Sequence, residues 1–430
     1  MTRRLLFLHP YVKALRRDPL ILPFFVPTIS VALALGLLTP VIPYYAESFG
    51  VSYGWVGVLT AAQALGTLVT DLPSGLLISR LGHRRAMVLG LVVGTVASAG
   101  LTWAGSVVAA LAYRFVSGIG FSLFGIARHA YFTEYSKVAN RGQSLALFGG
   151  LVRVGQFVGP MVGGALAASS GLRLPFLVSS LCCVPALLCV MLFTAGQQRT
   201  PDQAAALPTL SRERRARRGR FWALLRDRAG VLVPAHVGHV FAQMARSGRN
   251  TIIPLYASGA LNLDVDSVGL LMGIAAAVEM VMFAPAGWLM DHLGRKAAIV
   301  PSFTIQAVGM ALVPLTEGFA GLLACATAIG LGSGLSSGTM MVLGSDLAPP
   351  GARSEFLGVW ALIGDVGSMG GPALVGFAAD ALSLPTAALS MAIAGLAAAV
   401  TFGLFLPETL QRCDGAPLRL SAVIFGQRRR

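Results

Sequence analysis

Two short stretches with one pattern decide the fold of this chain: GLLISRLGHRR at residues 75–85 and GWLMDHLGRK at residues 287–296. In each stretch, an apolar run ends at a glycine that is followed directly by basic residues. A glycine at this place allows a tight reversal of the chain, and basic residues hold such a turn in water beside a membrane. The two stretches therefore predict the same turn made twice, once in each half of the chain.

The repeat extends well beyond these two stretches, at a constant spacing of 212 residues. Five pairs of glycines keep this spacing: Gly57 and Gly269, Gly75 and Gly287, Gly82 and Gly294, Gly118 and Gly330, Gly120 and Gly332. Three further pairs also keep it: Glu134 and Asp346, Arg141 and Arg353, Pro160 and Pro372. Chance matches do not hold one spacing over so long a stretch, so the chain is two copies of one unit.

The composition indicates that lipid is the solvent for most of the chain. Of its 430 residues, 55% are hydrophobic and only 12% are charged, and the mean hydropathy is +0.73. An average soluble domain carries roughly a quarter charged residues. We read twelve apolar spans, each long enough to cross a bilayer: 22–45, 54–79, 86–104, 107–131, 143–168, 175–196, 232–257, 267–290, 297–315, 319–344, 354–379 and 386–407.

The predicted fold is therefore an all-α membrane protein with twelve transmembrane helices in two pseudo-symmetric six-helix bundles. The first bundle occupies residues 1–196, a basic cytoplasmic linker 197–231, the second bundle 232–407 and a cytoplasmic tail 408–430. Parallel repeats of this kind are related by an axis along the membrane normal.

The net charge of +15 marks topology rather than a nucleic-acid partner. With the N-terminus inside, almost all Lys and Arg residues fall in segments on the cytoplasmic side, which places both termini there and predicts a multi-pass protein of the plasma (inner) membrane. The basic run SRERRARRGR at residues 211–220 is interpreted as a solvated linker, with a lipid-headgroup or regulatory contact as the alternative. The start of the chain lacks a small-residue cleavage site and is interpreted as a retained lead-in.

The repeated turns resemble the G-x-x-x-D-x-x-G-[RK]-[RK] signature of the major facilitator superfamily, and the chain resembles the twelve-span drug and multidrug proton antiporters of that family. In the family this loop latches the cytoplasmic side when the transporter opens outward. The resemblance implies a cytoplasmic gate formed by Gly75, Ser79, Gly82, Arg84, Arg85, Gly287, Asp291, Gly294, Arg295 and Lys296, joined by Glu134, Arg141, Asp346 and Arg353.

Two details of this gate can be predicted from residue type. Gly75 and Gly287 permit close helix packing near the cytoplasmic end. Ser79 stands where the family has an acid, so we expect the first latch to be weaker than the second, which carries Asp291. The alternative is that both loops serve only topology and the turn.

The fifth span contains a second element with implications for direction of transport. Its residues match the family's G-x-x-x-G-P-x-x-G-G element in full, through Gly155, Gly159, Pro160, Gly163 and Gly164. Within the family this element marks exporters that work by antiport. The glycines at every fourth position also make a smooth face for a neighbouring helix, and the proline bends the span.

Charged side chains inside the spans are the candidates for proton coupling, because ionisable groups in hydrocarbon are costly. Arg114 lies in an R-x-x-x-G-x-G element that the family associates with coupling, and its repeat mate is Ala326. Three acids lie inside spans: Asp71, Glu279 and Asp365. A desolvated carboxylate can bind and release protons as access alternates. The alternatives are a structural ion pair for the arginine and a fixed ion pair between the bundles for the acids.

The predicted solute cavity is cationic. Asp365 is the repeat mate of Arg153, so we expect both to face the centre. The cavity candidates are Arg153, Gln156, Arg246, Arg249 and Phe124. With Arg114, the spans contain four arginines against three acids, and this excess of positive charge favours an anionic or carboxylate-bearing solute.

The sequence therefore predicts a secondary transporter that exports small amphipathic organic compounds in exchange for protons by alternating access, working as a monomer. An importer or uniporter of a small organic anion or sugar-like solute is the nearest alternative, and a non-transporting receptor or scaffold is a further one. A membrane enzyme is disfavoured because no HExxH, CxxC, GxSxG or P-loop pattern occurs. We expect no metal and no cofactor; the proton gradient would supply the energy.

Overall fold

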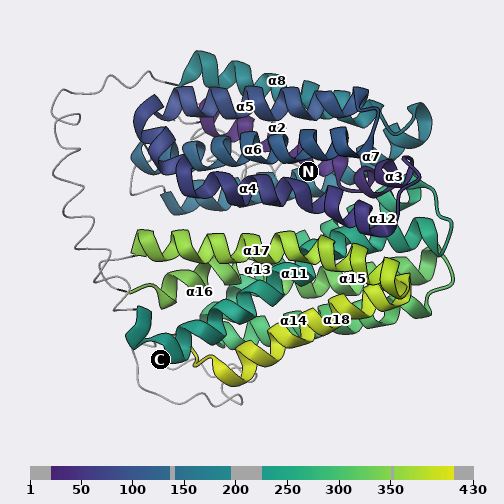
Figure 1. Cartoon of the computed structure of the whole chain (residues 1–430). Coiled ribbons are helices and arrows are strands. Elements are labelled where there is room, and N and C mark those ends of the chain that lie inside the picture. The colour runs from purple at the N-terminus through teal and green to yellow at the C-terminus, as the bar shows by residue number, and fades with distance from the viewer. Residues whose placement is uncertain (1–20, 136–140, 195–224, 350–352, 411–430) are drawn as a thin grey trace, which may run out of the picture.

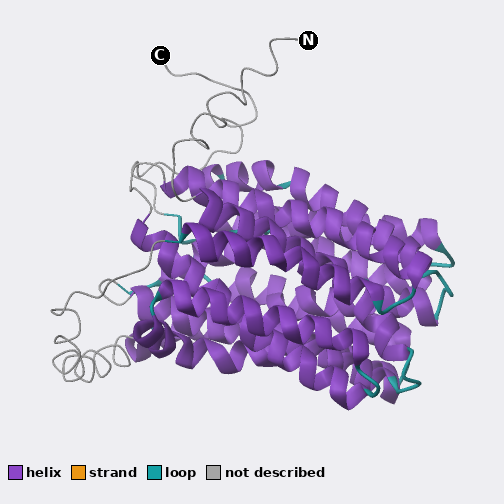
Figure 2. Ribbon diagram, turned by 90° about the horizontal axis from the view of Figure 1, so that it is seen from above, coloured by secondary structure: helices purple, strands orange, loops and turns teal. Residues whose placement is uncertain are grey.

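The structure is a computed structural model that describes residues 21–135, 141–194, 225–349 and 353–410. These ranges are almost entirely helical and contain no strand. Seen in Figure 2, the helices run side by side, and the described loops and turns gather at the two ends of the molecule. The predicted all-α membrane fold is confirmed.

The described helices form the predicted two sets of six spans (Figure 1). The first half contains η2 (Ile21–Phe25), α2 (Val26–Leu38), α3 (Val41–Glu47), α4 (Tyr53–Leu81), α5 (His83–Gly100), η3 (Leu101–Trp103), α6 (Val107–Tyr135), α7 (Arg141–Ser170) and α8 (Leu174–Phe193). The second half contains α11 (Ala229–Gly259), α12 (Val265–Val281), α13 (Phe283–His292), α14 (Arg295–Leu312), η5 (Val313–Leu315), α15 (Phe319–Leu335), α16 (Thr339–Leu347), α17 (Arg353–Ala381), α18 (Leu384–Val400) and η6 (Thr401–Phe405).

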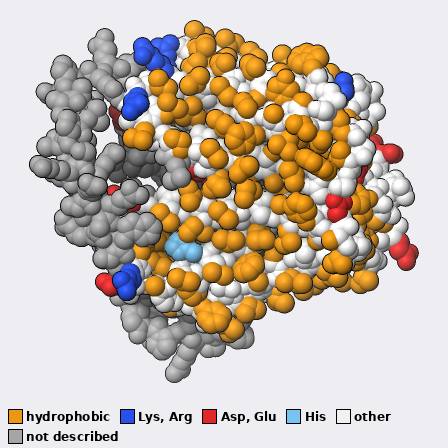
Figure 3. All heavy atoms as spheres, viewed as in Figure 1, with side chains coloured by type: hydrophobic (Ala, Val, Ile, Leu, Met, Phe, Trp, Pro, Cys, Tyr) orange, Lys and Arg blue, Asp and Glu red, His pale blue; other side chains and the backbone are white. Residues whose placement is uncertain are grey.

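Most of these segments are long and apolar enough to cross a bilayer. Ten described helical segments meet that requirement, and the bent helix α4 makes eleven. The twelfth segment, α11, has 31 residues, which is ample length for a span, but it carries Arg246 and Arg249. Figure 3 shows the apolar surface that this fold presents: hydrophobic side chains cover the middle, and most of the visible Lys and Arg side chains lie at one end.

Several spans are bent or broken, which hydropathy does not reveal. Helix α4 bends by 62° between Asp71 and Pro73. The eighth span breaks between α12 and α13, close to Pro285, the 212-residue mate of Pro73. Proline inside a helix removes a backbone hydrogen bond, so the repeated proline accompanies a bend in the second span and a break in the eighth. The tenth span breaks at Gly338, whose φ of 78° favours glycine.

Both signature turns reverse at a glycine as predicted. Gly82 and Gly294 have φ values of 80° and 111°, a region that side-chain-bearing residues rarely adopt. The second turn has an additional support from the start of the tail. Glu408 accepts hydrogen bonds from the backbone N–H groups of Arg295 and Lys296, at 2.8 and 3.0 Å. It thereby caps the exposed N-terminus of α14 with a negative charge.

The two halves meet along two helix pairs, α4 with α17 and α7 with α12. We call the end of the molecule that carries the signature turns the linker side, and the opposite end, which carries α3, the far side (Figure 1). At the far side the halves are packed tightly through glycines. A Cβ on Gly57 would lie 2.9 Å from the Cα of Gly376, and one on Gly164 would lie 3.0 Å from the Cα of Gly269.

These two glycine contacts are copies of each other. Gly269 is the 212-residue mate of Gly57, and Gly376 is the mate of Gly164. Further bonds close the same end of the molecule. The Tyr44 hydroxyl donates to the Leu263 carbonyl at 2.7 Å, and Asp380 accepts from the backbone N–H of Gly54 at 2.8 Å. The far side is therefore sealed by contacts between the halves.

Candidate functional site

A polar cavity lies between the two halves. Its main part has a volume of about 790 Å³ and is lined from both halves, with α7 opposite α11 and α12. A second part of about 350 Å³ lies beside α4 and α17 and shares four lining residues with the first: Thr39, Ser247, Asn250 and Ser368. These shared residues make the two parts neighbours within one site between the bundles.

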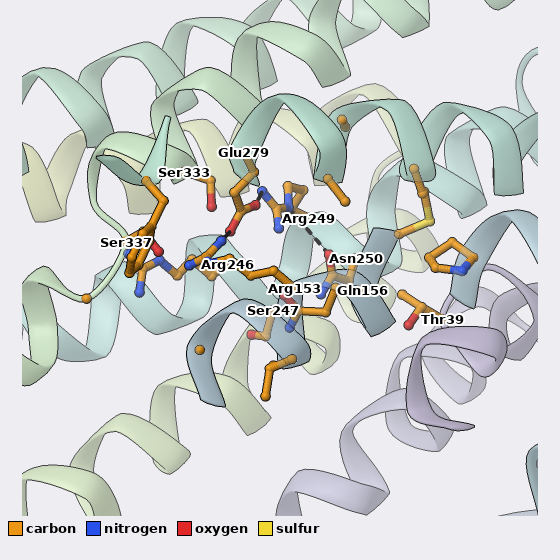
Figure 4. A pocket seen from close by; sticks show the side chains of 18 of the residues that line it. Thr39, Arg153, Gln156, Arg246, Ser247, Arg249, Asn250, Glu279, Ser333 and Ser337 are labelled. Atoms are coloured by element: carbon orange, nitrogen blue, oxygen red, sulfur yellow. Dashed lines mark hydrogen bonds and ion pairs between the residues drawn. The ribbon is translucent and has the colours of Figure 1, made fainter. Parts of the chain in front are cut away.

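The strongest feature of the main cavity is an ion-paired cluster. Arg153 of α7 donates to Glu279 of α12, with Nη1 and Oε1 3.1 Å apart. Arg249 of α11 reaches the other carboxylate oxygen of Glu279 at 3.5 Å. Each of these three side chains is less than 20% exposed. Figure 4 shows them pointing toward one another, so a single carboxylate joins cations from both halves.

A third arginine of the cavity has a structural partner. Arg246 donates through Nη2 to the carbonyl oxygen of Ser336 at 2.9 Å and to its hydroxyl at 2.6 Å. Ser336 follows the last residue of α15, and its carbonyl also accepts from the backbone N–H of Thr339 at 3.1 Å. Arg246 also lies 5.4 Å from the ring centroid of Phe303. It therefore satisfies the break in the tenth span while still lining the cavity.

The second part of the cavity holds the other predicted acids. Asp365 of α17 lines it, together with Arg114 of α6 and polar side chains of α4. The carboxyl groups of Asp365 and Asp71 are hydrogen-bond partners across the two halves. Ser122 of α6 donates a bond of 2.7 Å to Oδ1 of Asp71. The structure thus brings two of the three candidate acids together.

Arg114 is close to this region without pairing with these acids. Its side chain is 7% exposed, and within the described part of the chain its Nε has no hydrogen-bond partner. The described ion pairs do not include it. The sequence-based alternative of a structural ion pair for Arg114 therefore has no support among the described residues.

The gate residues form ion pairs within each half. In the second half, Arg295 pairs with Asp291 at 3.2 Å and with Asp346 at 3.1 Å. In the first half, His83 lies 3.4 Å from Glu134. His83 and Glu134 are the 212-residue mates of Arg295 and Asp346, so the two pairs are copies that differ in the basic residue.

The remaining gate side chains contact their own half. Arg84 donates to the carbonyl of Met191 at 2.6 Å, and Lys296 donates to that of Gly403 at 2.7 Å. Ser79 donates to the carbonyl of Leu76 at 2.8 Å, Arg353 contacts the hydroxyl of Ser345, and Arg85 is exposed. The side chain of Arg141 lies outside the described part of the structure.

The signature glycines do not pack closely against another helix in this conformation, contrary to expectation. Cβ atoms placed on Gly75 and Gly287 would meet nothing within 4 Å. Both glycines lie toward the linker side, beyond the bends in the second and eighth spans. The main cavity extends toward the same side, where Phe148 and Met341 line it. The halves are therefore separated at the linker side and joined at the far side.

The element of the fifth span packs on two faces. Gly155, Gly159 and Gly163 lie against α2, where Cβ atoms on them would come within 2.6 Å or less of α2 atoms. Gly164 faces α12 across the two halves, and the Pro160 carbonyl approaches Gly269 of that helix. The predicted smooth face is present, and the element also contributes to the far-side closure.

Arg153, Gln156, Arg246 and Arg249 line the cavity, whereas Phe124 does not. The Phe124 side chain is 1% exposed and lies in the core of the first half, because apolar periodicity alone does not distinguish the face toward the cavity from the face toward the bundle core. Arg128, absent from the predicted site, lies 5.0 Å from its ring centroid and is buried. Its signal in the sequence is an arginine three residues from the end of the fourth predicted span.

Several uncharged polar residues of the cavity were also missed: Gln243, Ser247, Asn250, Ser333 and Ser368. The signal that would have found those of α11 is a polar residue at helical spacing from Arg246.

The described residues do not form a metal site. Within the described residues, no group of three or more His, Cys, Asp or Glu side chains is arranged to hold a metal ion.

The fold and the cavity first define a class: a multi-pass membrane protein built from two repeated helix bundles around a polar central site. The model of the Major Facilitator Superfamily matches residues 24–233 and 235–414. The chain therefore belongs to the major facilitator superfamily, and the resemblance predicted from the signature loops is confirmed.

Individual relatives support the same assignment. The chain is 22% identical over 363 residues to an uncharacterized MFS-type transporter of Methanocaldococcus jannaschii, covering 84% of this chain and 91% of that protein. It is 24% identical over 311 residues to the uncharacterized MFS-type transporter YcaD of Escherichia coli, covering 67% and 76%.

Solved structures share the fold. A D-xylose–proton symporter superimposes with a TM-score of 0.71 at 20% identity, over 89% of this chain and 97% of that chain. A POT family transporter in complex with a thioalcohol-conjugated peptide has a TM-score of 0.71 at 11% identity, over 89% and 94%. At these identities the likeness concerns the fold alone.

Proposed function

We propose that this protein is a secondary active transporter that exports small amphipathic organic anions in exchange for protons by alternating access. The observation that carries the proposal is the cluster of Arg153, Arg249 and Glu279 inside a polar cavity between the two halves. A solute that binds there contacts both halves at once, and such contact is what alternating access around a midplane site requires.

An acidic group is the substrate feature that this site recognises best. The main cavity presents three arginines and one glutamate, so its charge is not balanced. Arginine donates paired hydrogen bonds to carboxylate and phosphate-like groups. Phe283, Leu271, Met272 and Ile253 supply apolar surface in the same cavity, which suits an organic remainder.

The proposed direction and coupling have separate supports. The full match to the antiporter element at Gly155–Gly164 supports export, and the buried acids Asp71, Asp365 and Glu279 supply candidate proton carriers. Under the positive-inside rule the linker side is cytoplasmic. The present conformation then corresponds to a transporter that is open to the cytoplasm, where an exporter loads its solute.

The test uses the purified protein in liposomes that contain a fluorescent pH indicator and hold a preset proton gradient. The anionic probes are benzenesulfonate and larger arylsulfonates, whose charge is permanent, so they do not carry protons across the lipid themselves. Benzenesulfonamide and benzyltrimethylammonium are the neutral and cationic matches. We expect one or more anions to collapse the gradient and the matches to leave it intact. Equal responses to the cation, or no response to any anion, would contradict the proposed substrate class.

A matched pair of variants connects the response to the site. Arg249→Gln removes one cavity cation, whereas Arg173→Gln removes an exposed arginine at the start of α8. We expect the first variant to lose the anion response and the second to keep it. Protein-free liposomes measure the leak of each probe.

The amide side chains of the cavity favour a second candidate function, which is import or uniport of a sugar-like solute. Gln156, Gln243 and Asn250 lie in the same cavity as the arginines, and amides suit hydroxyl-rich ligands. The sign of the proton flux separates the candidates. An exchanger moves solute and proton in opposite directions, a symporter moves them together, and a uniporter moves no proton.

A further inference from the structure

Two carboxyl groups from opposite halves meet at the α4–α17 contact. Asp71 and Asp365 are hydrogen-bond partners, and Ser122 donates a further bond to Oδ1 of Asp71 at 2.7 Å. An ionised carboxylate only accepts hydrogen bonds, so a bond between two carboxyl groups requires a proton on one of them. One proton shared between the two carboxyl groups would therefore join the bundles at this contact.

This acid pair lies where the closed part of the interface ends. On the far-side part of α4, Gly57 packs against Gly376 of α17, and α4 then bends by 62° directly after Asp71. Beyond the bend, Gly75 faces open space. The acid pair thus lies at the boundary between the sealed region and the separated region of the same two helices.

The surroundings do not hold a cation against the pair. Arg114 of α6 lines the same cavity as Asp365, and α11, which packs against α17, carries His239 and Arg246. Arg246 is bonded to Ser336, and His239 stacks on Trp360 at 4.3 Å and lies against Gly364. Helix α18 contains no charged residue.

The other charged or titratable groups of α6 and α11 have partners elsewhere. Arg249 pairs with Glu279, Arg128 donates to Thr28, His129 contacts the Phe148 ring, and His236 bonds to the Leu232 carbonyl. Glu47 of α3 accepts from Ser258 at the far side, and Asp346 of α16 pairs with Arg295 at the linker side. The basic residues of α5 lie at its linker-side start: His83, Arg84 and Arg85.

We propose that Asp71 and Asp365 act together as a proton-dependent link between the bundles, which holds this conformation while one proton is shared and weakens it when that proton leaves. The inference rests on the proposed proton coupling and assigns it to a pair of residues rather than to a single acid. On release, the O–H bond of the protonated acid breaks, and the proton passes to water in the cavity that Asp365 lines. Two carboxylates then face each other across the α4–α17 contact and repel.

The experiment measures conformation without solute and without a gradient, so it does not depend on any transport activity. Spin labels at Arg80→Cys and Glu355→Cys, both exposed near the linker-side ends of α4 and α17, are placed in a variant without the native cysteines. Distances between the labels are recorded from about pH 5 to about pH 9, a range over which perturbed carboxyl groups titrate. We expect the ratio of open to closed linker sides to fall by about tenfold across this range, as one pKa unit of coupling would produce.

Three variants identify the groups responsible. Asp71→Asn and Asp365→Asn each supply an amide N–H that bonds the remaining carboxylate without a proton, so the open conformation should become independent of pH. Asp380→Asn changes a third acid of the α4–α17 contact, which accepts bonds at the far side, and should leave the pH response in place.

A pH-insensitive parent protein would overturn the proposal, as would an unchanged response in both asparagine variants. His239→Gln tests the nearest other titratable group, and loss of the response in this variant with retention in Asp71→Asn would also overturn it. A loss of anion transport with a normal conformational response would instead contradict the proposed function and leave the acid-pair link supported.

Discussion

Two helix pairs join the halves, α4 with α17 and α7 with α12. They are alike in their packing at the far side and differ in the charged residues that they carry beside the cavity. At the far side both pairs close through glycines that are copies of each other, Gly57 with Gly376 and Gly269 with Gly164. Closer to the cavity, one repeat position carries Arg153 in the first half and Asp365 in the second. Both interfaces therefore have the same glycine contact, but they carry opposite charges at the equivalent position beside the cavity.

The difference determines what each interface is able to bind. In the α7–α12 pair, Glu279 already pairs with Arg153, and also with Arg249 of α11, so an incoming anion competes with a carboxylate. In the α4–α17 pair, Asp365 meets Asp71, and a proton shared between them is the link proposed above. In the proposed exchange, the anion would bind at the α7–α12 interface and the proton at the α4–α17 interface.

The largest effect on transport is expected from removal of the α7–α12 charge link. Arg153→Ala leaves Glu279 with one partner, and loss of one partner of a buried pair costs about 3–5 kcal/mol. Because Arg249 remains, we expect about 1–2 kcal/mol of stability to be lost and anion transport to fall about tenfold to hundredfold. Thermal unfolding and the gradient-collapse assay measure the two effects.

A variant that retains transport would contradict the role of the link. Arg153→Lys is the matched comparison, since it keeps the charge but replaces the planar guanidinium. We expect its stability to lie close to that of the parent protein and its transport to lie between those of the parent and Arg153→Ala.

An intermediate effect is expected from the repeated glycine contacts, and here the two interfaces should behave alike. Gly164→Val and Gly376→Val each place side-chain atoms where a Cβ alone would lie 3.0 Å or less from a backbone atom. Overpacking of this kind costs about 1–3 kcal/mol. We expect both variants to lose far-side closure, measured as reaction of a cysteine at Tyr53→Cys with an impermeant thiol reagent.

Gly75→Val is the control for these two variants, because nothing lies within 4 Å of its added Cβ in this conformation. Its stability and far-side reactivity should match the parent protein. Different behaviour of Gly164→Val and Gly376→Val would show that the two closures are not equivalent despite their common origin.

The smallest effect is expected where the far side is asymmetric. Asp380 accepts bonds from Ser52 and from the N–H of Gly54, and so caps the start of α4 from the other half. Its repeat position in the first half is Ala168, so α12 has no equivalent partner. Loss of a capping acceptor costs about 1 kcal/mol, and less at an exposed site. We expect Asp380→Ala to lower the unfolding temperature slightly and Ala168→Gly, the control for the mate position, to leave closure unchanged.

The repeat predicted much of this arrangement from the sequence alone. The 212-residue spacing placed the signature turns, and it predicted correctly that Arg153 and Asp365 would both face the centre. It did not predict that Arg153 pairs with Glu279, because the choice of partner depends on how the halves dock, which no repeat within a half encodes. The interpretation of Phe124 failed for a related reason, since several faces of a membrane helix are apolar and only packing distinguishes them.

The break in the tenth span has a mechanical consequence. Span four is one continuous helix, α6, whereas span ten consists of α15 and α16 separated by Gly338. The buried carbonyl of Ser336 at this break accepts bonds from the Arg246 side chain and from the backbone N–H and the hydroxyl of Thr339. Two of these three donors are side chains, which can leave the carbonyl without unwinding either helix. The second half thus contains a joint that the first half lacks, and motion of α16 about that joint would reshape the cavity wall without any rotation of one half against the other.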